Sequence, residues 1–249
     1  MRCRCGASFI RDVPAQSERP DQRGSDYTGF TSETVKGVNG LRVAVSATCG
    51  YAHIDPARLT PLDAAAHALA EAGARIDYAD PPIWNFRKGY VTLCESAFSG
   101  VVAGMGPERM ALLDPGLIET ARRGMMISAA VARQAELERI QLIQAFVGFF
   151  NEYDLLLTPC VPIAPFLAGH GVNTPDLEKY PDWYDWTPYT WVFNAAKLPA
   201  ASCPWGLDAG GLPQAVQLAA AHFREDFVLR ASAALEAKAP VVRPDHVLS

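Results

Sequence analysis

The feature that most constrains the fold is a strand–helix–strand pattern near the start of the chain. Residues 40–46 (GLRVAVS) form a short β-branched run after a turn signal, which is typical of a buried strand. A helical pattern follows, with Thr60-Pro61 as its expected start and Gly73 as its expected end. Residues 74–78 form a second strand-like run. Because parallel strands are joined by a long crossover, this unit predicts a parallel pair with a helix packed across it.

The middle of the chain continues this alternation of helices and strands. Helical patterns cover 84–105 and 117–150, and Gly124 marks an expected bend or break in the longer one. Residues 153–158 (YDLLLT) then form a continuous apolar run that ends at a proline, which favours a buried strand.

A hairpin and a closing helix complete the pattern. Two strand-like runs, 200–204 and 214–220, flank Gly210-Gly211, a pair that favours a tight turn. An amphipathic helix is expected over 223–238. Together these elements predict an α/β fold, a layered α/β/α arrangement around a mixed sheet.

Composition indicates a globular protein and excludes one class of partner. The 249 residues are 49% hydrophobic and 20% charged, which is enough apolar material for a sizeable core. We expect one domain over residues 31–249, preceded by a polar tail or connector over 1–30. The net charge is -5 and no Lys/Arg stripe is present, so nucleic acid is not an expected partner.

No segment has the pattern of a membrane span, a secretory signal or a metal site. The chain starts without an apolar run, and prolines interrupt its longest uncharged stretch, 155–175. The six cysteines are scattered, apart from a lone C-x-C at Cys3 and Cys5. We therefore expect a cytoplasmic protein with reduced thiols, no membrane partner, and neither a metal nor another cofactor.

Three segments, taken in order, resemble the C-terminal part of the amidase-signature enzymes. The first is the strand–helix–strand unit, and the second is the long helical pattern that leads into 153–159 (YDLLLTP). The third and most specific is FNAAKLPAASCP at 193–204, with GGLP at 210–213 and a strand containing Gln217 after it. The match covers roughly residues 26–240 and is also similar to the A subunit of glutamyl-tRNA amidotransferases. It implies hydrolysis of a C–N bond in a small-molecule amide.

The catalytic residues that this resemblance implies are absent from the sequence. Amidase-signature enzymes share two adjacent serines in a Gly/Ser-rich stretch, together with an upstream lysine that activates them. This chain has no Ser-Ser pair and no G-x-S-x-G motif, and Ser96 and Ser99 fall in helical sequence. In the family, the catalytic set lies N-terminal to the matched region. We expect that the chain lacks the catalytic half and supplies no catalytic residue.

Two further features, the Cys160–His170 pair and Lys197, allow a functional and a structural interpretation. Cys160 follows a strand and His170 lies ten residues later, a pair that would be chemically competent only if the two met in space. Lys197 stands where the family pattern has glycine. Its cation either points at a carboxylate-bearing substrate or is solvated at the rim of a site.

The best candidates for substrate binding are Trp186, Tyr189 and Asn194. They lie in the aromatic segment 183–194, which prolines interrupt, and irregular segments on a rigid scaffold often carry binding groups. By the resemblance, this segment sits directly before the Phe-Asn pair that faces the active site of amidases. Asn194 can both donate and accept hydrogen bonds to an amide. The alternative is that the aromatic side chains fill the core.

Two functions from different classes remain. The first is an amide hydrolase, represented here by its substrate-side half. The second is a non-catalytic truncated or pseudo-enzyme binding module that needs a companion chain carrying the serines. In either case a sheet without its first half would expose strand edges, so we also expect self-association of the isolated chain.

Overall fold

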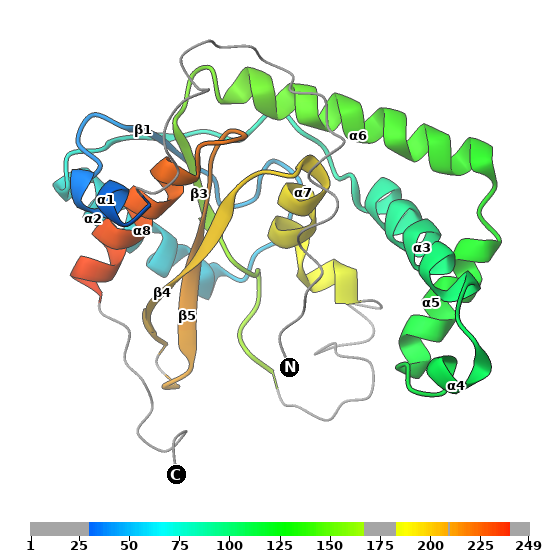
Figure 1. The fold of residues 1–249 in the computed structure, drawn as a ribbon. Coiled ribbons are helices and arrows are strands. Elements are labelled where there is room, and N and C mark those ends of the chain that lie inside the picture. The colour runs from blue at the N-terminus through cyan, green and yellow to red at the C-terminus, as the bar shows by residue number, and fades with distance from the viewer. Residues whose placement is uncertain (1–29, 167–182, 209, 240–249) are drawn as a thin grey trace.

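A mixed five-stranded sheet organises the part of the chain that the structure, a computed structural model, describes: residues 30–166, 183–208 and 210–239 (Figure 1). The strand order is β2-β1-β3-β5-β4. The strands are β1 (Arg42–Val45), β2 (Arg75–Tyr78), β3 (Leu155–Pro159), β4 (Ala200–Leu207) and β5 (Pro213–Ala219). β1 pairs in parallel with both β2 and β3, and β5 pairs antiparallel with β3 and β4. The predicted parallel pair and the predicted hairpin are both confirmed.

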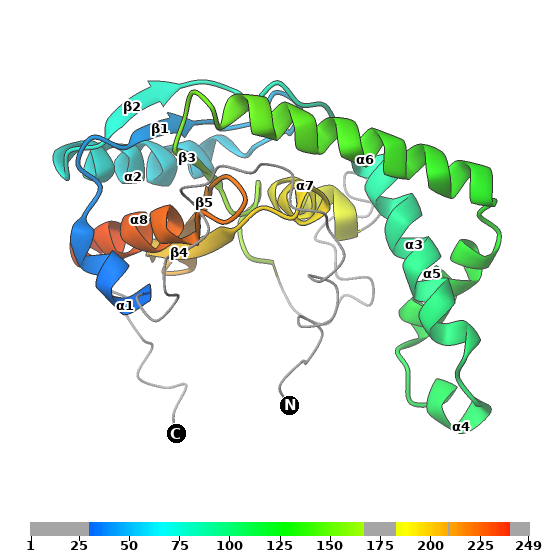
Figure 2. The same ribbon diagram turned by 45° about the horizontal axis from the view of Figure 1, so that its top comes forward.

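The helices occupy both faces of the sheet and one lateral arm. They are α1 (Phe30–Glu33), α2 (Leu59–Glu71), α3 (Arg87–Ala103), α4 (Pro107–Met110), α5 (Pro115–Met125), α6 (Ala129–Phe149), α7 (Pro188–Ala196) and α8 (Glu225–Lys238). α2 and α8 pack on one face, and α6 and α7 on the other. Figure 2 shows α3, α4 and α5 extending to one side as an arm beneath the far end of α6. The predicted layered α/β/α arrangement is confirmed.

The apolar run of β3 is continuous because both of its faces are covered. Leu155 and Leu157 face the core beneath α2 and α8, whereas Leu156 faces the core beneath α6 and α7. All three side chains are fully buried. Strands buried on both faces do not alternate between apolar and polar residues, which is the pattern the sequence shows here.

Two helix boundaries differ from their predictions. α2 begins at Leu59 rather than after Thr60, because Asp55 caps a short 3-10 turn (Pro56–Arg58) that leads directly into it. Gly124 does not break the long helical pattern, since it lies inside α5. The break falls after Met125, where the Ser128 side chain accepts a hydrogen bond from the backbone of Val131 and starts α6.

The predicted tail falls almost entirely outside the described residues, which begin with Phe30 at the start of α1. In the described ranges, every helix is too short or too polar to cross a bilayer.

Candidate functional site

The carboxyl ends of β1 and β3 form a switch point in the topology of the sheet. The two strands are parallel neighbours, but the chain leaves β1 toward β2 on one side and leaves β3 toward β4 on the other. In open α/β sheets, ligands bind outside the carboxyl ends of strands at such a point. The segments that follow the two strands, 46–55 and 160–166, are tied together because the Asp55 backbone N–H donates to the Pro162 carbonyl at 2.9 Å.

Two of the three predicted binding residues contact these segments. The Trp186 ring meets the Phe166 ring edge to face, with centroids 5.3 Å apart. The Tyr189 hydroxyl donates to the Ala47 carbonyl at 2.6 Å. Trp186 is half-buried and Tyr189 is fully buried. Burial raises the pKa of Tyr189, so its hydroxyl stays protonated and remains a donor at neutral pH. The structure therefore places Trp186 against the segment that follows β3 and Tyr189 against the segment that follows β1.

Asn194 lies apart from that pair. Its side chain is exposed on α7 and lies near Tyr90 of α3. Tyr90 stacks on Trp191, with ring centroids 5.9 Å apart, and meets Tyr184 edge to face. Burial raises the pKa of Tyr90 to about 12. Asn194 thus belongs to a polar and aromatic contact between α3 and α7.

A buried amide that the sequence prediction missed holds the start of α7 on the sheet. Gln217 of β5 is 8% exposed, and its Nε2 donates to the Tyr189 carbonyl at 3.0 Å and to Thr158 Oγ1 at 3.4 Å. A buried polar group is costly unless it is paired, so these bonds fix the segment that carries Trp186 and Tyr189. The signal was visible in the sequence as a polar residue inside an apolar strand.

The segment after β1 is braced by a second polar network. The Ser46 hydroxyl donates to Asp80 at 2.5 Å and accepts from the Cys49 backbone N–H at 2.7 Å. The Tyr51 hydroxyl donates to the Pro188 carbonyl at 2.8 Å, at the first residue of α7. Ser46 is fully buried and both of its hydrogen bonds serve the loop, so its role here is structural.

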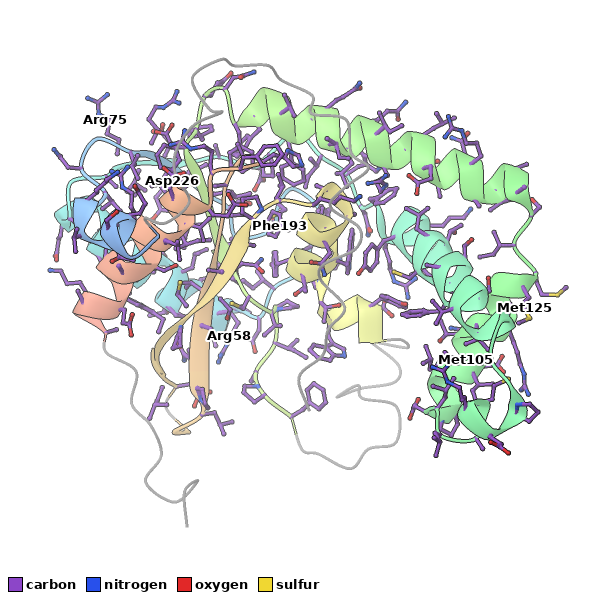
Figure 3. The ribbon with its side chains drawn as sticks, viewed as in Figure 1. Arg58, Arg75, Met105, Met125, Phe193 and Asp226 are labelled. Carbon is purple, nitrogen blue, oxygen red and sulfur yellow. The ribbon has the colours of Figure 1, made fainter. Side chains whose placement is uncertain are left out.

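An arginine that the sequence prediction also missed ties the β4–β5 turn to the start of α2. Arg58, labelled in Figure 3, is buried. Its Nη2 lies 3.6 Å from Asp208 Oδ2. The pKa of Asp208 lies below its usual value despite some desolvation. Its carboxylate accepts from the Leu212 backbone N–H and from the Gly210 N–H, and it lies beside the Arg58 cation. This pair fixes the hairpin, whose far strand carries Gln217.

The described residues contain no activated nucleophile that could replace the missing serines. Cys160 Sγ lies 3.1 Å from Ser202 Oγ, and burial raises the pKa of the thiol to about 11. The thiol is therefore protonated at neutral pH, whereas catalysis needs the thiolate. His170, its suggested partner, lies outside the described residues. Ser96 and Ser99 lie in α3 as predicted, and Ser99 donates to the Ser96 carbonyl at 2.7 Å.

The described ranges also hold no cluster of three or more His, Cys, Asp or Glu side chains suited to a metal ion.

Comparison with known proteins gives consistent matches. A family model described as Amidase matches residues 7–229. The chain is 31% identical over 227 residues to an acylamidase of Rhodococcus erythropolis, and this match covers 86% of this chain and 45% of that protein. It is 27% identical over 236 residues to the A subunit of the glutamyl-tRNA(Gln) amidotransferase of Brevibacillus brevis, covering 85% of this chain and 47% of that protein.

Solved structures show the same fold. A bacterial aryl acylamidase of the amidase signature family superposes with a TM-score of 0.72 at 24% identity, over 85% of this chain and 46% of that one. A 6-aminohexanoate cyclic dimer hydrolase superposes with a TM-score of 0.75 at 22% identity, over 91% and 51%. The chain thus spans about half the length of the relatives it matches.

Proposed function

The chain belongs to the amidase family, and from that membership we propose that it binds a small amide at the switch point but does not hydrolyse it unaided. The observation that carries this proposal is the half-buried Trp186 ring against Phe166, in a segment that the buried Tyr189 ties to the loop after β1. Aromatic walls with a few polar groups are typical of small-molecule sites. The absence of a Ser-Ser pair from the sequence argues against turnover.

Binding is tested by titrating the purified chain with benzamide, an aryl amide, and following tryptophan fluorescence and NMR line shifts. We expect saturable binding that the Trp186→Ala variant weakens at least tenfold. Trp205→Ala is the matched control, because Trp205 is also half-buried but packs on the opposite face of the sheet. Equal affinity in the two variants would remove the switch point as the binding site.

Turnover is tested on the same preparation with simple aliphatic and aryl amides. We expect ammonia release no faster than from a sample whose serine and cysteine side chains have been chemically blocked. Release well above that blocked sample would show that the chain has its own nucleophile, and the binding-only proposal would be abandoned.

A companion chain is a second candidate, favoured by one observation. Several relatives are named as one subunit of an amidotransferase, and this chain covers under half the length of the one from Brevibacillus brevis. We propose that a chain carrying the catalytic serines and lysine would complete the site. Mixing this chain with the complementary N-terminal half of the Rhodococcus erythropolis acylamidase tests this idea. Amide hydrolysis by the mixture, absent from each part alone, is the expected result, and an inactive mixture that nonetheless forms a complex counts against it.

A further inference from the structure

The two edges of the described sheet differ in charge. β2, at one edge, carries Arg75 and Asp77, whereas β4, at the other edge, has eight residues (AASCPWGL) and no charge. Proteins commonly protect edge strands with charged side chains, prolines and bulges, because an open edge offers hydrogen-bonding groups to another chain. Figure 2 shows β4 at the margin of the sheet, away from β2. β2 is protected by charge, and β4 is not.

The backbone of β4 offers donors on its outer side. Neighbouring residues of an antiparallel strand direct their N–H and C=O groups to opposite sides. The Ala220 N–H donates to the Pro199 carbonyl at 3.1 Å. In this register the backbone N–H and C=O groups of Ala201 and Cys203 also point toward β5. Ala200 and Ser202 therefore direct their N–H and C=O groups outward, where no strand of the described ranges pairs with them.

The open stretch of this edge is short and has a definite end. Pro204 is the next outward residue and has no N–H to donate, and the register shifts between Pro204 and Leu207. These two features protect the hairpin end of β4 and leave its first half open. The side chains of Ala200 and Ser202 are small and exposed, so another backbone can approach closely.

A second copy of the same strand fits this edge. Like charges on opposed strands are destabilising, and β4 has none to oppose. With Ala201 on a two-fold axis, Ala200 of each copy lies opposite Ser202 of the other, and each outward N–H meets an outward carbonyl. We propose that two copies of this chain pair antiparallel through β4 and so join their sheets. This inference goes beyond the proposed function and does not depend on amide chemistry.

Light scattering after size-exclusion chromatography tests the pairing. We expect the wild-type chain to have twice its monomer mass at high concentration, and Ala200→Lys to return it to the monomer because it places like charges on opposed strands. Val147→Lys is the matched control, since Val147 is half-exposed on helix α6 and is not part of the sheet. A monomeric wild type, or a dimer that only Val147→Lys disrupts, would overturn the proposal.

Hydrogen exchange on the wild-type chain decides the matter without any variant, in case Ala200→Lys does not fold. The Ala200 and Ser202 amides should exchange quickly in dilute protein and at least tenfold more slowly at concentrations where the mass doubles. The outward amides of β2 should not change with concentration. Equal exchange of the Ala200 and Ser202 amides at both concentrations contradicts pairing through β4, whatever mass is measured.

Discussion

At the scale of single residues, Lys197 shows how this chain departs from its family. It ends α7 with φ 56° and ψ 37°, the left-handed conformation in which glycine is favoured at helix ends. The family pattern has glycine at this position, and the structure supplies the reason for that preference. The lysine side chain is exposed, so burial does not offset the strain. Whether its cation meets a substrate carboxylate stays a prediction.

The Lys197→Gly variant should raise the free energy of unfolding by about 1 kcal/mol, because it removes the left-handed strain of a residue with a Cβ. Urea denaturation measures the change. Lys197→Ala removes the same charge but keeps the Cβ, so it should stay within about 0.5 kcal/mol of the wild type. If alanine stabilises as much as glycine does, the charge and not the backbone is responsible.

At the scale of elements, the arm depends on a close contact between α3 and α5. A Cβ built on Gly124 would clash with the Glu95 carbonyl oxygen and would lie 2.9 Å from the Ser99 Cβ. The same contact is reinforced by an ion pair between Arg123 and Glu95 at 2.5 Å. Figure 3 shows Met105 and Met125 on this arm, well away from Phe193 and the sheet. Glycine is therefore required here for helix packing and not for a helix break.

Gly124→Ala should lower the free energy of unfolding by about 1–3 kcal/mol, because the added methyl group forces α3 and α5 apart. Gly100→Ala is the matched control on α3, where an added Cβ meets nothing within 4 Å. The control should gain up to about 1 kcal/mol from helix propensity alone. Thermal or urea unfolding of both variants checks the pair, and a neutral Gly124→Ala would show that the helices can separate at little cost.

Local patterns predicted the elements well but could not predict which of them meet. The strands 40–46 and 153–158 were recognisable from short apolar runs, and the parallel pairing followed from the crossover helix. The predicted start of α2 is wrong because the Asp55 side chain caps a preceding 3-10 turn that leads directly into the helix. The segment 183–194 was recognised as irregular, and the structure divides it into a 3-10 turn and α7.

The candidate site was predicted only in part for the same reason. Trp186 and Tyr189 meet the segments after β3 and β1, whereas Asn194, on the same short helix as Tyr189, is exposed beside Tyr90. The residue that holds this segment, Gln217, comes from a strand later in the chain. Such contacts between distant segments depend on the strand order, which no single local pattern encodes.

At the scale of the whole molecule, the Asp154 carboxylate links two strands that lie apart in the sequence. Asp154, just before β3, accepts from the Arg42 backbone N–H at 2.8 Å and from its guanidinium at 3.0 Å. Burial raises the pKa of Asp154, but the hydrogen bonds and charge of Arg42 outweigh burial and hold it below its usual value. The pKa of Asp226 in α8 is lowered in the same way, because burial raises it but the hydrogen bond and charge of nearby Arg224 outweigh that effect. These groups make the stability of the fold sensitive to acid.

The pH dependence follows from the direction of these shifts. A carboxyl whose pKa is lower in the folded chain stabilises the fold above its unfolded pKa, and this contribution disappears as the pH falls through the folded value. The wild-type free energy of unfolding should therefore drop below about pH 4. Urea titrations between pH 5 and pH 3 should show a flatter slope for Asp154→Asn. Arg42→Gln should flatten the slope partly, since its backbone N–H still donates. Parallel curves for all three proteins would contradict this assignment.

The unequal charge of the two sheet edges also bears on how far assembly could proceed. A chain with two open edges can add copies at both ends without limit and grow into a fibre. Here Arg75 and Asp77 block β2, so pairing through β4 would occupy the uncharged edge of each copy. A self-complementary contact about a two-fold axis closes on itself. The same asymmetry that leaves β4 open would thus stop growth at two copies.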